Sequence, residues 1–211
     1  MRRNLILFLS LTCFLSCNQA QQPGTAETHK EREVGGYCEG CEALLEYRGE
    51  LSNTDTIPGF EAYEPKLVIK GTVYQNDGVT PASDVIVYFY HTNREGIYEP
   101  TDDPQGWEKR HGQHRGWIRT DDSGAYKIYT FRPASYPNTS NPQHVHITVK
   151  EPDTNPYYIT SIHFKDDPLM QDSETGSNPR GGPGLCEVDT VNGVQYVTRD
   201  IMLGENIPGY N

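Results

Sequence analysis

Two histidines separated by one residue form the strongest local chemical signal in the chain. They lie in the segment 143–149, Gln-His-Val-His-Ile-Thr-Val, whose β-branched residues favour a strand. Alternate side chains of a strand point to opposite faces, so the apolar residues would face the core while His144 and His146 share the other face. Two imidazoles on one rigid face can converge on a single metal ion. A solvated strand face that happens to hold two histidines is the alternative.

Two tyrosines that precede the histidines are candidates for further ligands. Tyr136 lies in the sequence Arg-Pro-Ala-Ser-Tyr-Pro that begins at Arg132, where the flanking prolines restrict the backbone and can aim the ring. Tyr98 lies in a second loop, Glu-Gly-Ile-Tyr-Glu-Pro, residues 95–100. Phenolate oxygens combined with imidazole nitrogens suit a hard, highly charged ion such as Fe(III). Taken singly, each tyrosine is more often a core or rim residue.

About seven short strands must position these side chains. Segments rich in β-branched and aromatic residues begin near Leu67, Val85, Gly116, Tyr126, His144, Tyr158 and Val194. Turn signals such as Asn-Asp-Gly at 76–78 separate them, and no long helical periodicity occurs. We therefore expect an all-β, prealbumin-like β-sandwich of about seven or more short strands. The glycine- and proline-rich stretches 91–115 and 167–188 are expected to be long loops, which often carry function.

The first 16 residues predict an exported lipoprotein. Arg2 and Arg3 precede an apolar run that is too short to span a bilayer, which needs about 20 residues, and this arrangement is typical of a signal peptide. The sequence Phe-Leu-Ser-Cys at 14–17 resembles a bacterial lipobox. It predicts a lipid on Cys17, membrane attachment through that lipid, and a location in the bacterial cell envelope. An ordinary signal peptide with a chance cysteine is the alternative.

The rest of the chain is predicted to have two parts. Residues 17–55 would form a disordered, polar tether and a cysteine-containing extension, and residues 56–211 one principal domain. In an oxidising compartment Cys38 and Cys41 could form a disulfide, or one of them could bridge to Cys186. The formal net charge of −11 opposes binding to phosphate backbones, so we expect no nucleic-acid partner.

The order of the motifs resembles the intradiol ring-cleavage dioxygenases. The similarity covers roughly residues 65–170 and consists of the glycine- and proline-containing segments 71–81, 96–98, 115–126, 132–137 and 142–146. The resemblance implies a β-sandwich that holds one ferric iron through Tyr98, Tyr136, His144 and His146. Tyr98 and His144 would be the equatorial ligands, and Tyr136 and His146 the axial ones. The substrates would be O2 and a catechol-type aromatic diol, which binds as a dianion in place of Tyr136 and is cleaved between its hydroxylated carbons, a step of aromatic compound catabolism.

Three residues depart from the family pattern. Asn141 stands where the family has an arginine that stabilises charge on the activated ring, so Arg132, or else Arg115, is the candidate to replace it. Ser161 and His163 replace a glutamine and a tyrosine of the family. Since the ligands are kept while their surroundings differ, we expect an unusual substrate or a weakened catalyst.

Two other functions are compatible with the sequence. Prealbumin-like sandwiches also serve as non-catalytic binding modules of the cell envelope, although such modules have no reason to keep two tyrosines and the His-x-His sequence in this order. A zinc protein using His144 and His146 would need further protein ligands. An oligomer is possible and would have to be built on the sandwich itself.

Overall fold

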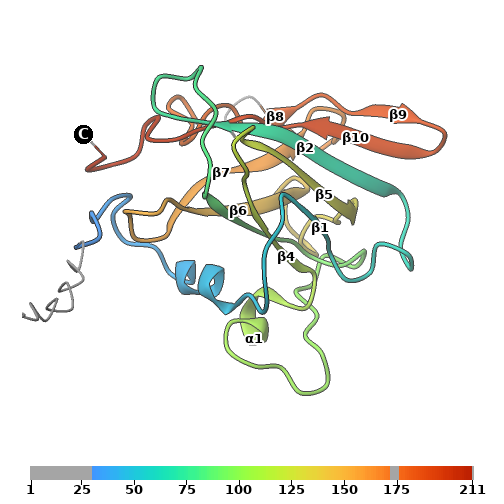
Figure 1. Cartoon of the computed structure of the whole chain (residues 1–211). Coiled ribbons are helices and arrows are strands. Elements are labelled where there is room, and N and C mark those ends of the chain that lie inside the picture. Colours follow the sequence, from blue (N-terminus) through green and yellow to red (C-terminus); the bar gives the residue numbers. More distant parts are fainter. Residues whose placement is uncertain (1–29, 172–175, 211) are drawn as a thin grey trace, which may run out of the picture.

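A computed structural model describes residues 30–171 and 176–210 (Figure 1). The predicted signal peptide, Cys17 and most of the predicted tether lie outside the described residues. The elements in chain order are the 3-10 helix η1 (Cys41–Glu46), β1 (Thr54–Thr56), β2 (Lys66–Tyr74), β3 (Ile86–Tyr90), α1 (Glu108–His111), β4 (Arg115–Arg119), β5 (Ala125–Phe131), β6 (His144–Lys150), β7 (Tyr157–Phe164), β8 (Leu185–Cys186), β9 (Asp189–Val191), β10 (Val194–Thr198) and β11 (Ile201–Met202).

The strands form two sheets. One sheet has the order β1-β5-β2-β10-β9, with β11 paired to β2, and the other has the order β4-β3-β6-β7-β8. The prediction of an all-β sandwich is therefore confirmed. The predicted strand from Val194 to Met202 is interrupted, because Arg199 and Asp200 leave the ladder between β10 and β11. No helix in the described part of the chain has the length and apolar character of a membrane-spanning segment.

The core lies between the sheets and follows the predicted alternation. Val145, Ile147 and Val149 of β6 are buried, whereas His144 and His146 are only partly covered. The facing sheet contributes buried residues such as Leu67 and Ile69 of β2 and Ile128 of β5. Each such side chain contributes roughly 1.5–3 kcal/mol when it leaves water. This apolar layer fixes the register of β6 and therefore the face on which the two histidines stand.

The N-terminal extension covers part of the outer face of the second sheet. Ala43 and Leu44 of η1 are fully buried and form a small apolar cluster with Ile86 and Tyr88 of β3. The Nε1–H of Trp117 donates a hydrogen bond of 3.3 Å to the Ala43 carbonyl oxygen. A disulfide joins Cys38 to Cys41 just before η1. Of the two pairings open from the sequence, the local one is present, and Cys186 is a buried free cysteine.

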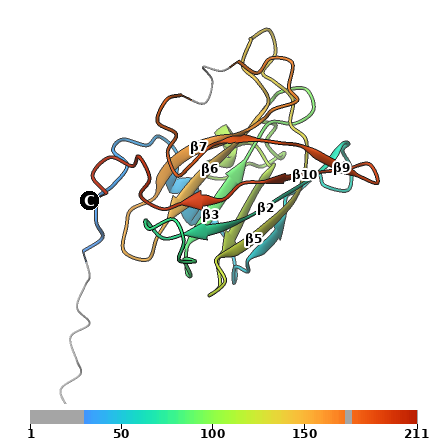
Figure 2. The same ribbon diagram turned by 90° about the horizontal axis from the view of Figure 1, so that it is seen from above.

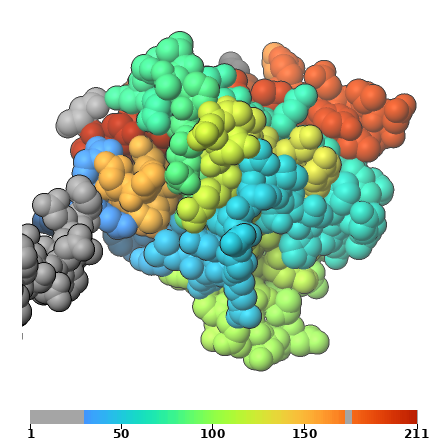
Figure 3. Space-filling model, viewed as in Figure 1, coloured from blue at the N-terminus to red at the C-terminus, as the bar shows by residue number. Residues whose placement is uncertain are grey.

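A long loop projects from the sandwich, and the two ends of the described chain lie together away from it. The loop between β3 and β4 carries α1 and projects from the lower edge in Figure 1. At the opposite side, the C-terminal segment lies beside the start of the described chain (Figure 2), where the Gly35 N–H donates to the Pro208 carbonyl oxygen at 2.7 Å. Figure 3 shows the extension (blue) lying against the loop that carries α1 (lime green).

Candidate metal centre

One strand and two loops bring the four predicted ligands together. His144 and His146 lie at the start of β6, and the β3–β6 pairing sets Tyr90 opposite His146. Tyr98 follows a turn in which the Asn93 side-chain oxygen accepts hydrogen bonds from the backbone N–H groups of Glu95 and Ile97, both at 3.0 Å. Tyr136 lies in the loop between β5 and β6.

Gly96 is required where the two tyrosine loops meet. Its φ is +77°, a conformation that favours glycine. A Cβ at this position would collide with the backbone carbonyl of Ser135. The Gly-x-Tyr sequence therefore has a steric cause, because only a residue without a side chain lets the loop of Tyr98 pack directly against the loop of Tyr136.

The four donor atoms form a compact group. The Tyr98 and Tyr136 hydroxyl oxygens are 2.5 Å apart, and the Tyr98 oxygen lies 2.8 Å from Nε2 of His146. The Tyr136 oxygen lies 3.0 Å from Nε2 of His144 and 3.4 Å from Nε2 of His146. The two Nε2 atoms are 3.1 Å apart. The structure thus brings together all four residues that the sequence predicted as ligands.

These spacings fit a single metal ion. Ligands bound about 2.0–2.1 Å from one ion are separated by roughly 2.8 Å at right angles and roughly 3.4 Å at tetrahedral angles. Four of the five distances lie between 2.8 and 3.4 Å, and the Tyr98–Tyr136 distance of 2.5 Å is shorter. Among the described residues, His, Cys, Asp and Glu form no group of three or more that could hold a metal ion. A metal site here therefore depends on the two phenols, which favours a hard cation such as Fe(III) over zinc.

Hydrogen bonds orient both imidazoles toward the centre. Nδ1 of His144 lies 2.8 Å from the Pro142 carbonyl oxygen, which can only accept, so Nδ1 carries a proton and, in the neutral ring, the lone pair is on Nε2. Nδ1 of His146 lies 3.3 Å from the hydroxyl oxygen of Ser161. Partners of this kind fix the ring orientation and the tautomer of metal-binding histidines. Ser161, a departure from the family pattern, therefore supports His146 directly.

An irregularity in the sheet produces this contact. The β6–β7 register shifts between Val145 and Ile147, so that two residues of β7, Thr160 and Ser161, stand opposite His146 alone. An extra residue of this kind re-aims side chains, and such irregularities are frequent next to active sites. His163, the other departure on β7, pairs with His144, and their ring centroids are 5.7 Å apart.

Burial controls the protonation of the donors. Burial, with a further contribution from the Tyr136 hydrogen bond, raises the pKa of Tyr98 far above its usual value. Burial also raises the pKa of Tyr136, and burial lowers the pKa of His146 well below its usual value. The imidazole of His146 is therefore neutral, and one of its nitrogens has a lone pair that can bind a metal. The phenols can lose their protons here only if a cation compensates the charge.

Both candidate arginines, Arg132 and Arg115, are engaged by carboxylates. Arg132 is buried behind β6, where its guanidinium donates to the Gln143 side-chain oxygen at 2.6 Å and to Asp166 at 2.7 Å. Arg115 points to the other side of the loop, toward Glu46 at 2.8 Å. Asn141 is exposed. Of the described arginines, the one that lines a cavity with Tyr98, Tyr136 and His146 is Arg110.

Sequence reasoning missed three residues beside the centre. Tyr90 stacks on His146 with ring centroids 4.5 Å apart, and His111 stacks on the other face of Tyr90 at 3.9 Å. The His-x-His strand pairs with the strand that ends at Tyr90, so strand pairing could have indicated this residue. His111 lies in the long loop 91–115, where the sequence allowed either a position at the mouth of a pocket or simple loop surface, and Arg110 carried no comparable signal.

A family sequence model matches the part of the chain that contains this centre, and a curated relative also matches part of the chain. A sequence model of the family described as dioxygenase matches residues 48–180, more than half of the chain. A curated relative, the catechol 1,2-dioxygenase of Acinetobacter baylyi, is 34% identical over 70 residues. This alignment covers 33% of the present chain and 22% of the relative, so the matched part spans about a fifth of that protein.

Solved structures share the fold. The dioxygenase domain of a dioxygenase carbohydrate-binding protein fusion from Streptomyces sp. SirexAA-E gives a TM-score of 0.56 at 19% identity, and the match covers 74% of this chain and 91% of that one. Catechol 1,2-dioxygenase from Acinetobacter sp. ADP1 gives 0.54 at 20% identity, with coverage of 74% and 59%. At these identities the structural similarity establishes the architecture alone.

Proposed function

Because this chain belongs to the intradiol dioxygenase family, we propose that it is a ferric-iron oxidoreductase that cleaves a catechol-type diol between its two hydroxylated carbons and inserts both atoms of O2. The observation that carries the proposal is the convergence of Tyr98, Tyr136, His144 and His146, whose donor atoms are joined by five distances of 2.5–3.4 Å. Ferric iron held by these donors would supply the positive charge that keeps the diol ionised and makes its ring reactive toward O2.

Tyr136 is the residue that we propose makes room for the diol. It is half-buried, and the residues that follow it in its loop, 137–141, are exposed. Tyr98, by contrast, is held by the Asn93 turn and by packing of its backbone against Gly112. Released as a phenolate, Tyr136 would offer an oxygen that can accept one hydroxyl proton of the incoming diol.

Arg132 is proposed to act as a positioning residue. Its Nε donates to the side chain of Gln143, the residue directly before His144, and its guanidinium also stacks on Phe164 at 3.9 Å. Through these contacts it would hold the start of β6 in place. The role predicted from the sequence, stabilisation of charge on the ring in place of the family arginine, stays a prediction for Arg132.

We also propose that the protein acts outside the cytoplasm. The sequence features that support this are the predicted signal peptide at residues 1–16 and the lipobox cysteine, Cys17. The disulfide between Cys38 and Cys41 agrees with an oxidising compartment. Membrane fractionation of the native strain, with a Cys17→Ser variant as the control, tests this. The proposal predicts that the wild type sediments with membranes and that the variant does not.

Activity is tested by O2 consumption with a panel of catechols, together with identification of the ring-opened product. The proposal predicts one O2 consumed per diol and a dicarboxylic product opened between the former hydroxyl carbons. Iron without turnover on any diol would instead support a non-catalytic binding module. Zinc bound in place of iron would contradict the metal assignment.

A further inference from the structure

The disulfide-bonded segment Tyr37–Cys41 forms a wall of the space beside the metal centre. A cavity of about 680 Å³ runs over the outer face of β6 and β7 and is lined by His146, Tyr158 and the segment's residues 37–40. A smaller cavity of about 280 Å³ is lined by Glu39 together with Tyr98, Tyr136 and His146. Glu39 thus lies at the place where the two spaces meet. A bare catechol ring would leave most of the larger cavity unfilled, since drug-sized ligands occupy cavities of about 300–1,000 Å³.

Three contacts hold the segment in place. The disulfide closes it between Cys38 and Cys41. Gly40, with φ +84°, packs so closely that a Cβ would lie 2.8 Å from Nε2 of His111 and 3.2 Å from the Trp107 ring. Glu39 pairs with Nη1 of Arg110 at 2.6 Å. The wall is therefore built against the loop that carries α1.

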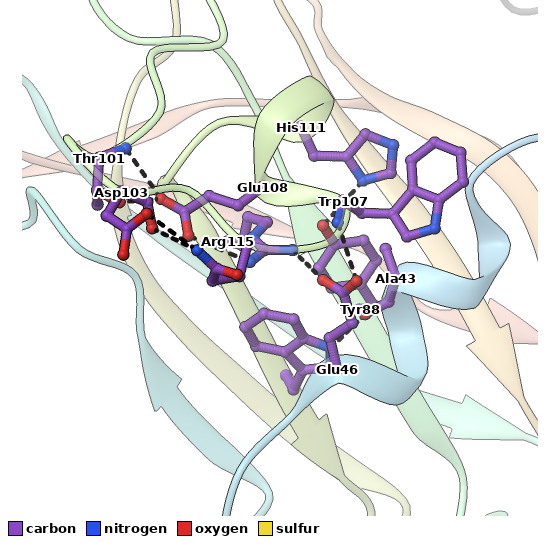
Figure 4. Close-up of polar contacts among 11 residues, drawn as sticks. Ala43, Glu46, Tyr88, Thr101, Asp103, Trp107, Glu108, His111 and Arg115 are labelled. Carbon is purple, nitrogen blue, oxygen red and sulfur yellow. Dashed lines mark hydrogen bonds and ion pairs between the residues drawn. The ribbon is translucent and has the colours of Figure 1, made fainter.

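A polar cluster anchors the extension beyond the wall, at the end of η1. Figure 4 shows the Arg115 guanidinium between the carboxylates of Glu46 and Glu108, at 2.8 and 3.9 Å. The second oxygen of Glu46 accepts the backbone N–H of Trp107 at 2.9 Å. Because Arg115 and Glu46 are both largely covered, this pair is shielded from solvent. The extension and the loop that carries α1 are thus joined twice, by the Glu39–Arg110 pair inside the disulfide loop and by the Glu46 contacts beyond it.

This wall is a feature outside the family match. The match begins at residue 48, whereas the segment and η1 lie before it. The metal ligands lie inside the matched region and the wall outside it. The part of the cavity that a ring substituent would touch can therefore differ from that of relatives, while the centre remains the same.

The charge of the lining indicates which substituents fit. Among the described residues that line the larger cavity, Glu39 is the one with a charged side chain, and no lysine or arginine is included. Tyr37, which is 87% exposed, and Tyr158 supply aromatic surface near the opening. Arg110, which lies beside this wall, is already paired with Glu39. On the other side, Arg180 stacks on the ring of Tyr158 at 4.1 Å and donates to the Gly35 carbonyl oxygen. An anionic substituent would therefore meet the Glu39 carboxylate but no unpaired cation on this wall.

We infer that Glu39 is a specificity-determining residue, and that the site takes a catechol with an uncharged or cationic substituent and discriminates against an anionic one. This inference rests on the proposed function. The substituent extends from the ring into the larger cavity, between the disulfide-bonded segment and the outer face of β6 and β7. Glu39 attracts an ammonium group there and repels a carboxylate.

Anaerobic titration calorimetry on the iron-loaded protein tests this without turnover. The probes are catechol and three diols of similar size: 4-ethylcatechol, 3,4-dihydroxyphenethylamine and 3,4-dihydroxyphenylacetate. We expect the acetate to bind most weakly to the wild type. In Glu39→Gln the ratio of the acetate Kd to the amine Kd should fall by about five- to tenfold, because two partly exposed charge contacts change. The Kd of 4-ethylcatechol should stay the same.

Glu42→Gln is the matched control, because Glu42 is an exposed carboxylate of the same extension. It should leave the ratio unchanged. An acetate that binds wild type best, or a ratio that does not respond to Glu39→Gln, would overturn the inference while leaving the proposed function standing. Failure of catechol itself to bind the iron-loaded protein would overturn the proposed function, and the inference with it.

Discussion

Nε2 of His144 and Nε2 of His146 lie 3.1 Å apart. In the neutral ring of His144, Nε2 carries a lone pair and no proton, so it can only accept a hydrogen bond. The Pro142 carbonyl oxygen holds the proton of His144 on Nδ1. Without a metal, the hydroxyl groups of Tyr136 and Tyr98 are the donors available to the two Nε2 atoms, at 3.0 and 2.8 Å. A cation that takes the place of the two phenol protons would join all four groups. The four donors are thus already assembled where the proposed metal would bind.

Removal of iron should therefore lower thermal stability. At a free iron concentration 100 times the Kd, binding contributes about 2.7 kcal/mol to the free energy of unfolding. For a domain of this size that corresponds to a Tm higher by roughly 5–10 °C. Calorimetric scans of the protein before and after chelation, and after iron is restored, measure this. Equal Tm values in the three samples would contradict a metal bound by the folded state.

Ser161→Ala should weaken iron binding while the fold is kept. The hydroxyl oxygen of Ser161 is the partner of Nδ1 of His146, at 3.3 Å. Loss of such a partner typically costs 10- to 100-fold in metal affinity. Competition with a chelator of known affinity gives the change. Thr148→Val, on the same face of β6, is the control and should bind iron as the wild type does. Equal affinity in both variants would show that Ser161 does not support His146.

Gly96→Ala should disturb the centre more than its backbone strain alone explains. Gly96 and Gly78 both have positive φ, at +77° and +71°. A Cβ on Gly96 meets the Ser135 carbonyl, whereas one on Gly78 meets nothing within 4 Å. Backbone strain should lower the free energy of unfolding by about 1 kcal/mol in both variants. Gly96→Ala should in addition reduce the iron content at fixed iron supply. A full iron content in both variants would contradict the role of this contact.

The four candidate ligands could be named from the sequence because their signals lie in short local motifs and in the order of those motifs. The alternation along β6 and the loop positions of Tyr98 and Tyr136 do not depend on distant contacts. The surroundings of the centre do depend on them. The shifted register that brings Ser161 to His146, and the packing of η1 on Tyr88, arise from tertiary contacts between segments far apart in the chain. Arg132 was predicted as the catalytic arginine, and its engagement with Asp166 could not be read from its motif.

Acid should destabilise the metal-free protein through His91. Burial lowers the pKa of His91 to about 3, and its two nitrogens face the Thr92 carbonyl oxygen and the Thr130 hydroxyl. The unfolded chain binds a proton near pH 6.5 while the folded one does not, so this contribution is complete above pH 6.5 and is lost as the pH falls. Between pH 7 and 5.5 the loss should be about 1.3 kcal/mol.

Urea unfolding at the two pH values, in wild type and His91→Gln, isolates this contribution. The variant should be less stable at pH 7 and should lose about 1.3 kcal/mol less on going to pH 5.5. The same dependence on pH in both proteins would assign the acid sensitivity to other groups.

The central claim is a ferric centre with tyrosinate ligands, and the visible spectrum of the purified protein, with iron measured on the same sample, tests it most directly. We predict one iron per chain and a reddish protein with a tyrosinate-to-iron charge-transfer band. Tyr98→Phe and Tyr136→Phe should each shift or abolish that band, whereas Tyr129→Phe, on β5 away from the centre, should leave it unchanged. A colourless wild-type protein without iron after growth and purification with added iron would contradict the claim.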